Sequence, residues 1–136
     1  MTVRVVVVDD SADVRRLLIA IIDGHDNHWS VVGQAADGRK AIEVAAATQP
    51  DLVLLDLSMP VMDGLEALPL ILLAAPAAAV VVLSGFPSHT ARAAAITAGA
   101  KDYLEKNALV LTLIPQLRKL LPGLEALPGG SPLEPV

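Results

Sequence analysis

The sequence predicts an α/β fold, a (βα)5 doubly wound parallel sheet of five strands with helices on both faces. Three short aliphatic runs, VRVVVVDD, DLVLLD and AAVVVLSG, are too short for helices and are bounded by polar or turn residues. Such runs are typical of strands that are covered on both faces of a parallel sheet. Segments with helical periodicity separate them, which is the pattern of a repeated βα unit. Right-handed crossovers then leave few other topologies.

The first half of the chain is expected to hold two strand–helix units. VRVVVVDD precedes a helix at Ala12–Ile22, whose apolar residues recur on one stripe and for which Ser11 is the expected cap. WSVVGQAA is a weaker strand candidate, and a helix at Gly38–Thr48 follows it. Both helices are therefore expected to bury one apolar stripe against the sheet.

The second half is expected to hold three more units. DLVLLD leads to a third helix that contains Pro69, AAVVVLSG leads to a helix at Ser88–Ala98 that stops at Gly99, and DYLEK leads to a last helix that contains Pro115. A proline inside a helix removes a hydrogen bond and kinks or delays the helix. We therefore expect irregular third and last helices.

The third helix is unusually apolar. Its segment LPLILLAAPAAA lacks the charges of a solvent-facing stripe, and four consecutive residues such as LILL cannot all face one core. Two interpretations stay open: a kinked helix with scattered exposed apolar groups, or a patch that binds a partner or a second copy.

Composition bounds the class of protein. The chain has 136 residues, enough for one domain with a real core, and 54% of them are hydrophobic. After Leu121 the composition changes to the Pro- and Gly-rich PGLEALPGGSPLEPV, so we expect a domain at residues 1–121 and a tail or linker at residues 122–136.

Charge and apolar-run length exclude some functions. The chain has no Cys, which excludes disulfides, thiolate metal sites and Cys nucleophiles. A net charge of -5 with scattered basic residues argues against direct binding of nucleic acid by this chain. Uninterrupted apolar stretches fall short of the ~18 residues that a spanning helix needs, so no membrane association is expected. The absence of Cys allows a cytoplasmic location, which is the expectation.

Polar residues end four of the five expected strands. Asp9 and Asp10 end the first strand, Asp56 the third, Ser84 the fourth and Lys106 the fifth. Each alone would be an ordinary solvated strand end or helix cap. The carboxyl ends of parallel strands meet at one edge, where ligands bind, so we expect these residues to converge.

The chemistry of this set follows from its charge. Three close carboxylates repel one another unless a cation is shared, and oxygen-only ligands suit a hard ion, most simply Mg²⁺. That ion and Lys106 can neutralise charge on a phosphoryl group. Ionised Asp56 is then the nucleophile that accepts this group, and Ser84 contributes a hydroxyl to it.

At these residues the chain resembles the response regulator receiver domain of two-component signal transduction. VVVVDDS, LLDLSMPVMDG, VVLSG and AGAKDYLEK occur in the order and spacing of that family, and the resemblance covers roughly residues 3–120. It implies a flavodoxin-like sheet with strand order 2-1-3-4-5. The segments VVGQAADG and YLEK are most similar to those of receivers that precede a helix-turn-helix output domain.

The resemblance also implies roles for the strand-end residues. Asp56 would be the phospho-acceptor, carrying an aspartyl phosphate, and Lys106 its phosphate partner. Mg²⁺ would be held by Asp10, Asp56 and the main-chain carbonyl of Ser58, with Asp9 acting mainly through a metal-bound water.

Further roles concern conformational switching and phosphoryl lifetime. By resemblance Ser84 would be the switching hydroxyl and Tyr103 the aromatic side chain that moves inward with it. Ser58 and Phe86 would flank the phosphoryl group and tune its lifetime. Phe86 has an equally weighted alternative, a loop aromatic that packs beside Pro87.

The expected function is a phosphorylation-controlled switch. A sensor histidine kinase or a phosphotransfer protein would phosphorylate Asp56 and so change affinity for an output protein or domain, with a homodimer as a further possibility. The protein is expected not to be an enzyme beyond its own phosphorylation and dephosphorylation. One alternative is a constitutive interaction module on the same fold. Another is a phosphatase-like hydrolase, although Ser58 occupies the place of its usual second acid.

Other polar residues are expected to have ordinary roles. His25 and His28 are taken as solvated loop residues, with a metal site as the alternative. Trp29 is expected to cover a sheet edge, and Arg15 and Arg16 to lie on the solvent face of the first helix.

Overall fold

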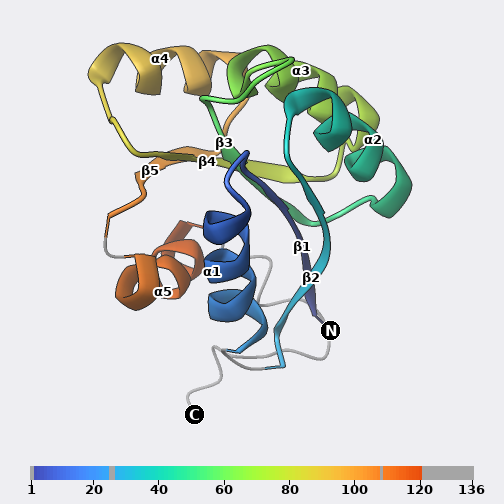
Figure 1. Ribbon diagram of the computed structural model, residues 1–136, viewed down its shortest axis with the longest axis vertical. Coiled ribbons are helices and arrows are strands. Elements are labelled where there is room, and N and C mark those ends of the chain that lie inside the picture. Colours follow the sequence, from blue (N-terminus) through green and yellow to red (C-terminus); the bar gives the residue numbers. More distant parts are fainter. Residues whose placement is uncertain (1, 25–26, 108, 121–136) are drawn as a thin grey trace.

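The five strands form one parallel sheet in the order β2-β1-β3-β4-β5, as predicted (Figure 1). The computed structural model describes residues 2–24, 27–107 and 109–120. The strands are Val3–Val8 (β1), Trp29–Ala35 (β2), Leu52–Asp56 (β3), Ala79–Ser84 (β4) and Asp102–Glu105 (β5). The helices are Ala12–Asp23 (α1), Gly38–Thr48 (α2), Gly64–Ala74 (α3), His89–Ala98 (α4) and Leu109–Leu120 (α5). His25 and the predicted tail at 122–136 lie outside the described residues.

The sheet is covered on both faces, which explains its unbroken aliphatic strands. Helices α1 and α5 lie on one face and α2, α3 and α4 on the other (Figure 1). Val5 and Val7 of β1 pack on the α1–α5 side, whereas Val6 and Val8 pack on the other side. Successive side chains of a strand point to opposite faces, so a run of valines fills two cores at once.

Helix ends follow the local sequence. The Ser11 side chain accepts a hydrogen bond from the Val14 main-chain N–H, and Ser88 caps α4 in the same way through Ala91. Gly99 ends α4 with φ of 116°, in the left-handed region that favours glycine. The expected caps at Ser11 and Gly99 are thus present.

The two internal prolines do not break their helices. Helix α3 runs through Pro69 and α5 runs through Pro115. In α3, Leu68 and Ile71 are buried, whereas Leu73 is 77% exposed. The apolar residues of α3 thus divide between core and solvent, which is compatible with both interpretations of this helix.

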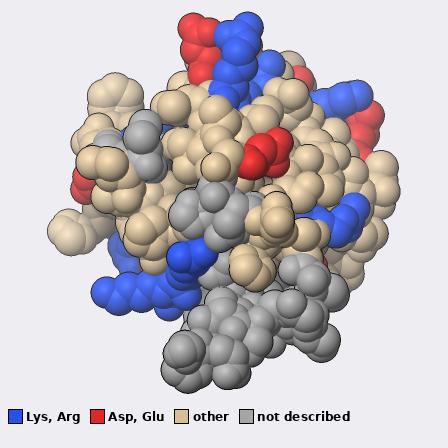
Figure 2. Space-filling model, turned by 90° about the horizontal axis from the view of Figure 1, so that it is seen from below, with Lys and Arg blue, Asp and Glu red and all other residues tan. Residues whose placement is uncertain are grey.

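The outer surface carries no continuous basic patch on the face that Figure 2 shows. Lys and Arg side chains lie there in separate groups around a largely uncharged middle, outside the area of undescribed residues. Within the described part of the chain, no helix is both long enough and apolar enough to cross a membrane.

The strand register brings the polar strand ends together. Val8 pairs with Leu55 across β1 and β3, so Asp9 follows β1 beside Asp56 at the end of β3. Between strands β4 and β5, Ser84 pairs with Glu105, and Lys106 is the residue that follows Glu105. The edge of the sheet therefore carries the residues that the sequence singled out.

Candidate functional site

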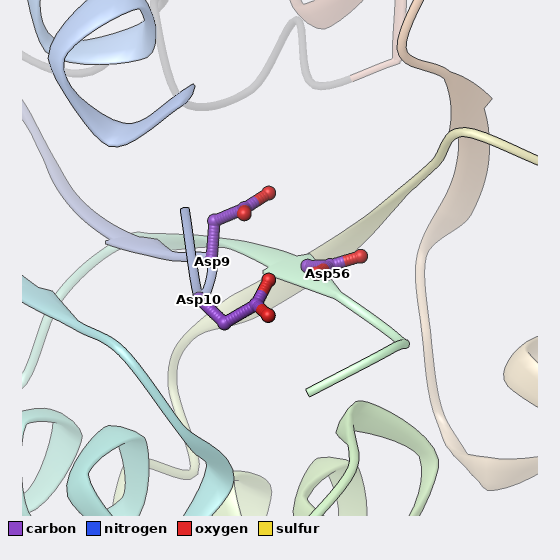
Figure 3. A group of neighbouring side chains, drawn as sticks. All are labelled: Asp9, Asp10 and Asp56. Atoms are coloured by element: carbon purple, nitrogen blue, oxygen red, sulfur yellow. The ribbon is translucent and has the colours of Figure 1, made fainter. Parts of the chain in front are cut away.

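Three carboxylates meet at the carboxyl edge of the sheet. Asp9, Asp10 and Asp56 each offer an oxygen atom, and these atoms lie within 4.8 Å of one another. Figure 3 shows the three side chains, with the Asp10 carboxyl group directed towards Asp56. Asp9 is 2% exposed and Asp56 is 5% exposed, whereas Asp10 is open to solvent. Among the described residues this is the one group of acids and histidines close enough to hold a metal ion.

Lys106 joins two of these acids. Its Nζ donates to Asp9 Oδ2 at 2.7 Å and lies 3.2 Å from Asp56 Oδ1. The main-chain N–H of Lys106 donates to the Ser84 carbonyl at 2.8 Å, which fixes the loop after β5 against the end of β4. One ammonium group thus contacts two of the three carboxylates, which leaves net negative charge at this edge.

Burial and like charge act on Asp56. Burial raises the pKa of the Asp56 carboxyl above its usual value, and the charge of Asp9 raises it further, while Lys106 opposes both. For Lys106, burial alone would lower the pKa. The hydrogen bond to Asp9 and the charges of Asp56 and Asp9 outweigh burial, so the pKa of Lys106 is raised. The site therefore favours the cationic lysine and disfavours an unshared Asp56 charge.

This donor set fits a hard divalent cation. The available atoms are carboxylate oxygens, one of them on an exposed side chain that can be reached from solvent, and Mg²⁺ prefers such ligands while keeping several waters. A divalent ion would also offset the net negative charge. The expectation of a Mg²⁺ site thus agrees with the residues present.

The loop after β3 is packed closely around Asp56. The Ser58 N–H donates to Asp56 Oδ1 at 3.4 Å, and the Gly64 N–H donates to the Leu57 carbonyl at 2.8 Å. A Cβ atom on Gly64 would lie 2.2 Å from the Asp56 carbonyl oxygen. The start of α3 therefore approaches the end of β3 as only glycine permits.

A cavity of about 290 Å³ opens beside Asp56. Its lining includes the predicted site residues Asp10, Asp56, Ser58, Ser84, Phe86 and Lys106. The Ser84 Oγ accepts a hydrogen bond from the Phe86 N–H at 3.2 Å. Phe86 itself is 92% exposed, so it borders the cavity without being buried in a core.

Tyr103 lies apart from this cavity. Its ring is buried against the face covered by α2, α3 and α4, and its hydroxyl oxygen accepts a hydrogen bond from the Ser88 N–H at 3.3 Å. It borders a second cavity of about 300 Å³, together with His89 and Arg92. The Arg92 guanidinium donates to the Tyr103 carbonyl at 3.1 Å. The aromatic side chain is thus held inward by the first residues of α4.

Arg15 makes contacts that the sequence did not predict. It is half-buried, and its Nη1 donates to the Asp9 carbonyl at 2.7 Å. Its Nε donates to Gln34 Oε1 at 2.8 Å. Arg16 is exposed, as expected, and pairs with Asp13. The helical spacing could not separate these neighbours, because the partner of Arg15 lies on another strand.

The fold and this acidic edge define a receiver-type domain. The sequence matches the response regulator receiver domain family over residues 5–118, and the chain therefore belongs to that family. Receiver domains generally bind Mg²⁺ at an acidic pocket and interact with histidine kinases or phosphotransfer proteins and with output domains. The family and the fold class that the sequence predicted are thus confirmed.

Relatives with curated descriptions are longer proteins. A protein-glutamate methylesterase/protein-glutamine glutaminase of Moorella thermoacetica is 48% identical over 111 residues, which cover 78% of this chain and 25% of that protein. The chain spans between 25% and 40% of the length of the curated relatives with this description.

Solved structures agree. The response regulator domain of Thermotoga maritima CheB is 32% identical to this chain, with a TM-score of 0.76. The match covers 99% of this chain and 100% of the CheB domain. In the CheX–CheY–BeF3–Mg complex from Borrelia burgdorferi, the matching chain is 25% identical, with a TM-score of 0.80 and coverage of 87% and 88%. Receivers of LuxR-family regulators share the fold as well.

The relatives correct one expectation. The sequence predicted that the protein is not an enzyme, and this is overturned by homologues that are named for methylesterase and glutaminase activities. The sequence prediction went wrong because the polar residues at the strand ends indicate a receiver domain and carry no information about a further activity. The matched region is the receiver part of these relatives, and the activities in their names belong to those longer proteins.

Proposed function

We propose that the protein is a phospho-accepting switch in which Asp56 takes a phosphoryl group from the phosphohistidine of a sensor histidine kinase or a phosphotransfer protein. The observation that carries this proposal is the placement of Asp56. It is a buried carboxylate that borders a cavity of about 290 Å³, with Lys106 Nζ at 3.2 Å and two further acids within 4.8 Å. An ionised carboxylate in such a place is a nucleophile that needs no general base.

The chain's own residues divide the work of the transfer. An Asp56 carboxylate oxygen attacks phosphorus, the O–P bond forms as the N–P bond of the donor breaks, and the imidazole nitrogen keeps the electron pair. Lys106 neutralises charge on the phosphoryl oxygens, and its hydrogen bond to Asp9 holds it in reach. Asp9, Asp10, Asp56 and the Ser58 carbonyl would hold Mg²⁺, which would supply further charge neutralisation when bound.

Ser84 and Tyr103 are proposed to report the phosphoryl group to the surface. Ser84 Oγ would leave its hydrogen bond with the Phe86 N–H and turn to the phosphoryl oxygens. Movement of the β4–α4 loop would then be felt by Tyr103, because the Ser88 N–H is bonded to its hydroxyl. Ser58 and Phe86 border the same cavity and would set how readily water reaches the phosphoryl group.

The kinship with methylesterases supports a finer proposal for the output. We place this receiver in the cytoplasm, in control of a protein-glutamate methylesterase/protein-glutamine glutaminase activity, because relatives up to 48% identical carry that description. Phosphorylation would then change contacts between the receiver and that output. A homodimer and direct binding of nucleic acid have no comparable support.

The test uses a small phosphoryl donor, so that no kinase has to be known. Incubation with phosphoramidate and Mg²⁺ is expected to add one phosphoryl group to the wild-type protein in intact-mass spectrometry and none to Asp56→Asn. Beryllofluoride with Mg²⁺ should shift the amide resonances of Ser84 and Tyr103. Absence of both effects in a folded protein would contradict the switch and favour the constitutive module. Sustained turnover of a phosphate ester would instead support the hydrolase.

A further inference from the structure

Arg15 makes a contact that the proposed transfer does not use. Its guanidinium reaches from α1 to the main-chain carbonyl of Asp9, at 2.7 Å, just beyond the end of β1. Gln34, an exposed residue on the neighbouring strand β2, accepts from Nε at 2.8 Å and so gives the guanidinium group a second partner. Two elements thereby hold one side chain in a single orientation.

The segment that Arg15 holds carries two of the three carboxylates. Asp9 Oδ1 accepts from the Ser11 N–H at 2.9 Å, and Asp9 Oδ2 accepts from Lys106. The side chain of Asp10, the next residue, has no such fixed environment, because it is open to solvent and projects towards Asp56 (Figure 3). Its position is therefore set by the backbone between Asp9 and Ser11.

We infer that Arg15, oriented by Gln34, is a positioning residue for the metal-binding carboxylates: it fixes the backbone of the β1–α1 turn so that Asp10 and Asp9 lie at ligand distance from Asp56. This inference rests on the proposed function, because it assigns Arg15 a role at the same site. Arg15 acts through the Asp9 carbonyl and is not itself a ligand.

The sign of the effect separates positioning from simple electrostatics. Arg15 is a cation near an acidic site, so removing its charge would by Coulomb's law strengthen the binding of Mg²⁺. Loss of positioning would weaken it, because outer-shell support of metal ligands commonly contributes 10-fold or more to affinity. The two accounts thus predict opposite changes.

The experiment measures the Kd of Mg²⁺ alone, from amide shifts of the full chain during titration with MgCl2. Arg15→Met is expected to raise this Kd about tenfold. The matched control is Arg16→Met, which removes the same charge from the neighbouring residue. Arg16 forms an exposed ion pair with Asp13, so this variant should leave the Kd unchanged or slightly lower. Urea unfolding in EDTA checks that each variant is folded.

Gln34→Ala provides a second test that leaves the charge unchanged. Like Arg15→Met, it should raise the Kd of Mg²⁺. In the Arg15→Met background it should cause no further rise, since both substitutions act through one contact. A merely structural role would lower stability in EDTA and leave the Mg²⁺ affinity of these variants unaltered, which would overturn the inference. Equal or tighter binding by Arg15→Met would overturn it as well. Lack of saturable Mg²⁺ shifts in the wild type would overturn the metal site itself, and with it both proposals.

Discussion

At the scale of single residues, Asp56 is a charge held in an unfavourable place. The carboxyl is buried beside Asp9, and one lysine offsets only part of the cost. Removing the charge leaves the hydrogen-bond acceptor in place and Lys106 still bonded to Asp9. Function at this residue therefore comes at the expense of stability in the absence of a bound cation.

Asp56→Asn is accordingly expected to raise the free energy of unfolding of the metal-free protein at neutral pH. Because the folded-state pKa of Asp56 lies above its unfolded value, the folded protein holds the proton more tightly and loses stability as pH rises between the two values. The gain from the substitution should be absent below the unfolded pKa and complete above the folded one. Urea unfolding in EDTA at several pH values measures it.

Asp13→Asn is the control for this pH series. Asp13 is on the exposed face of α1, paired with Arg16, and surface pairs contribute little. Its substitution should change stability by less than about 1 kcal/mol at every pH. A gain from Asp56→Asn that persists unchanged at low pH would contradict the electrostatic explanation.

At the scale of elements, the site depends on how helices approach strand ends. Helix α3 begins against the end of β3, and helix α4 begins directly after its cap, Ser88, whose main chain contacts Tyr103. Both junctions use small residues at the first turn of the helix. The element boundaries are therefore part of the site.

Gly64→Ala tests the junction of β3 and α3. The added Cβ would lie 2.2 Å from the Asp56 carbonyl oxygen, so the backbone must shift, and overpacking of this kind costs about 1–3 kcal/mol. Mg²⁺ binding should weaken with it, because the backbone of Asp56 moves. Gly85→Ala is the control: its Cβ would meet only Lys106 Cδ, at 3.9 Å, and stability should change by less than about 0.5 kcal/mol.

Ser88→Ala tests the start of α4. The substitution removes the acceptor for the Ala91 N–H and should cost about 1 kcal/mol, whereas Ser88→Gly should cost only a few tenths. Both variants keep the main-chain N–H that bonds to Tyr103. Denaturant unfolding gives the stabilities, and a large shift of the Tyr103 ring resonances in either variant would contradict the separation of the two contacts.

At the scale of the whole molecule, stability and ligand binding are linked. A cation that binds the folded chain and not the unfolded chain stabilises the protein by mass action. The three carboxylates come from two strands that are distant in sequence, so the unfolded chain offers no comparable site.

Mg²⁺ at about 100 times its Kd should therefore raise the free energy of unfolding by about 2.7 kcal/mol. Asp10→Asn should lose most of this gain, whereas Asp13→Asn should keep it. NaCl at matched ionic strength controls for screening. An equal rise with NaCl would mean that the effect is general screening of charge.

The sequence predicted most of the fold because its signals are local. Aliphatic runs flanked by helical segments are explained by strands covered on both faces, and the five units and the caps at Ser11 and Gly99 follow. The strand order is not a local signal and was predicted from the resemblance to receiver domains. Helices α3 and α5 continue through Pro69 and Pro115, and a kink at either proline stays a prediction. Packing against the sheet helps to keep both helices continuous despite the loss of one hydrogen bond.

The sequence by itself determined which carboxylates and which lysine meet, because parallel strands of one sheet bring their carboxyl ends to one edge. Asp9, Asp10, Asp56, Ser84 and Lys106 were predictable for that reason. Tertiary structure alone decided the surroundings of these residues: that Arg15 bonds to the Asp9 carbonyl while Arg16 pairs with Asp13, and that Phe86 is open to solvent. Arg15 also bonds to Gln34, 19 residues away on another strand, and local periodicity carries no information about such a contact.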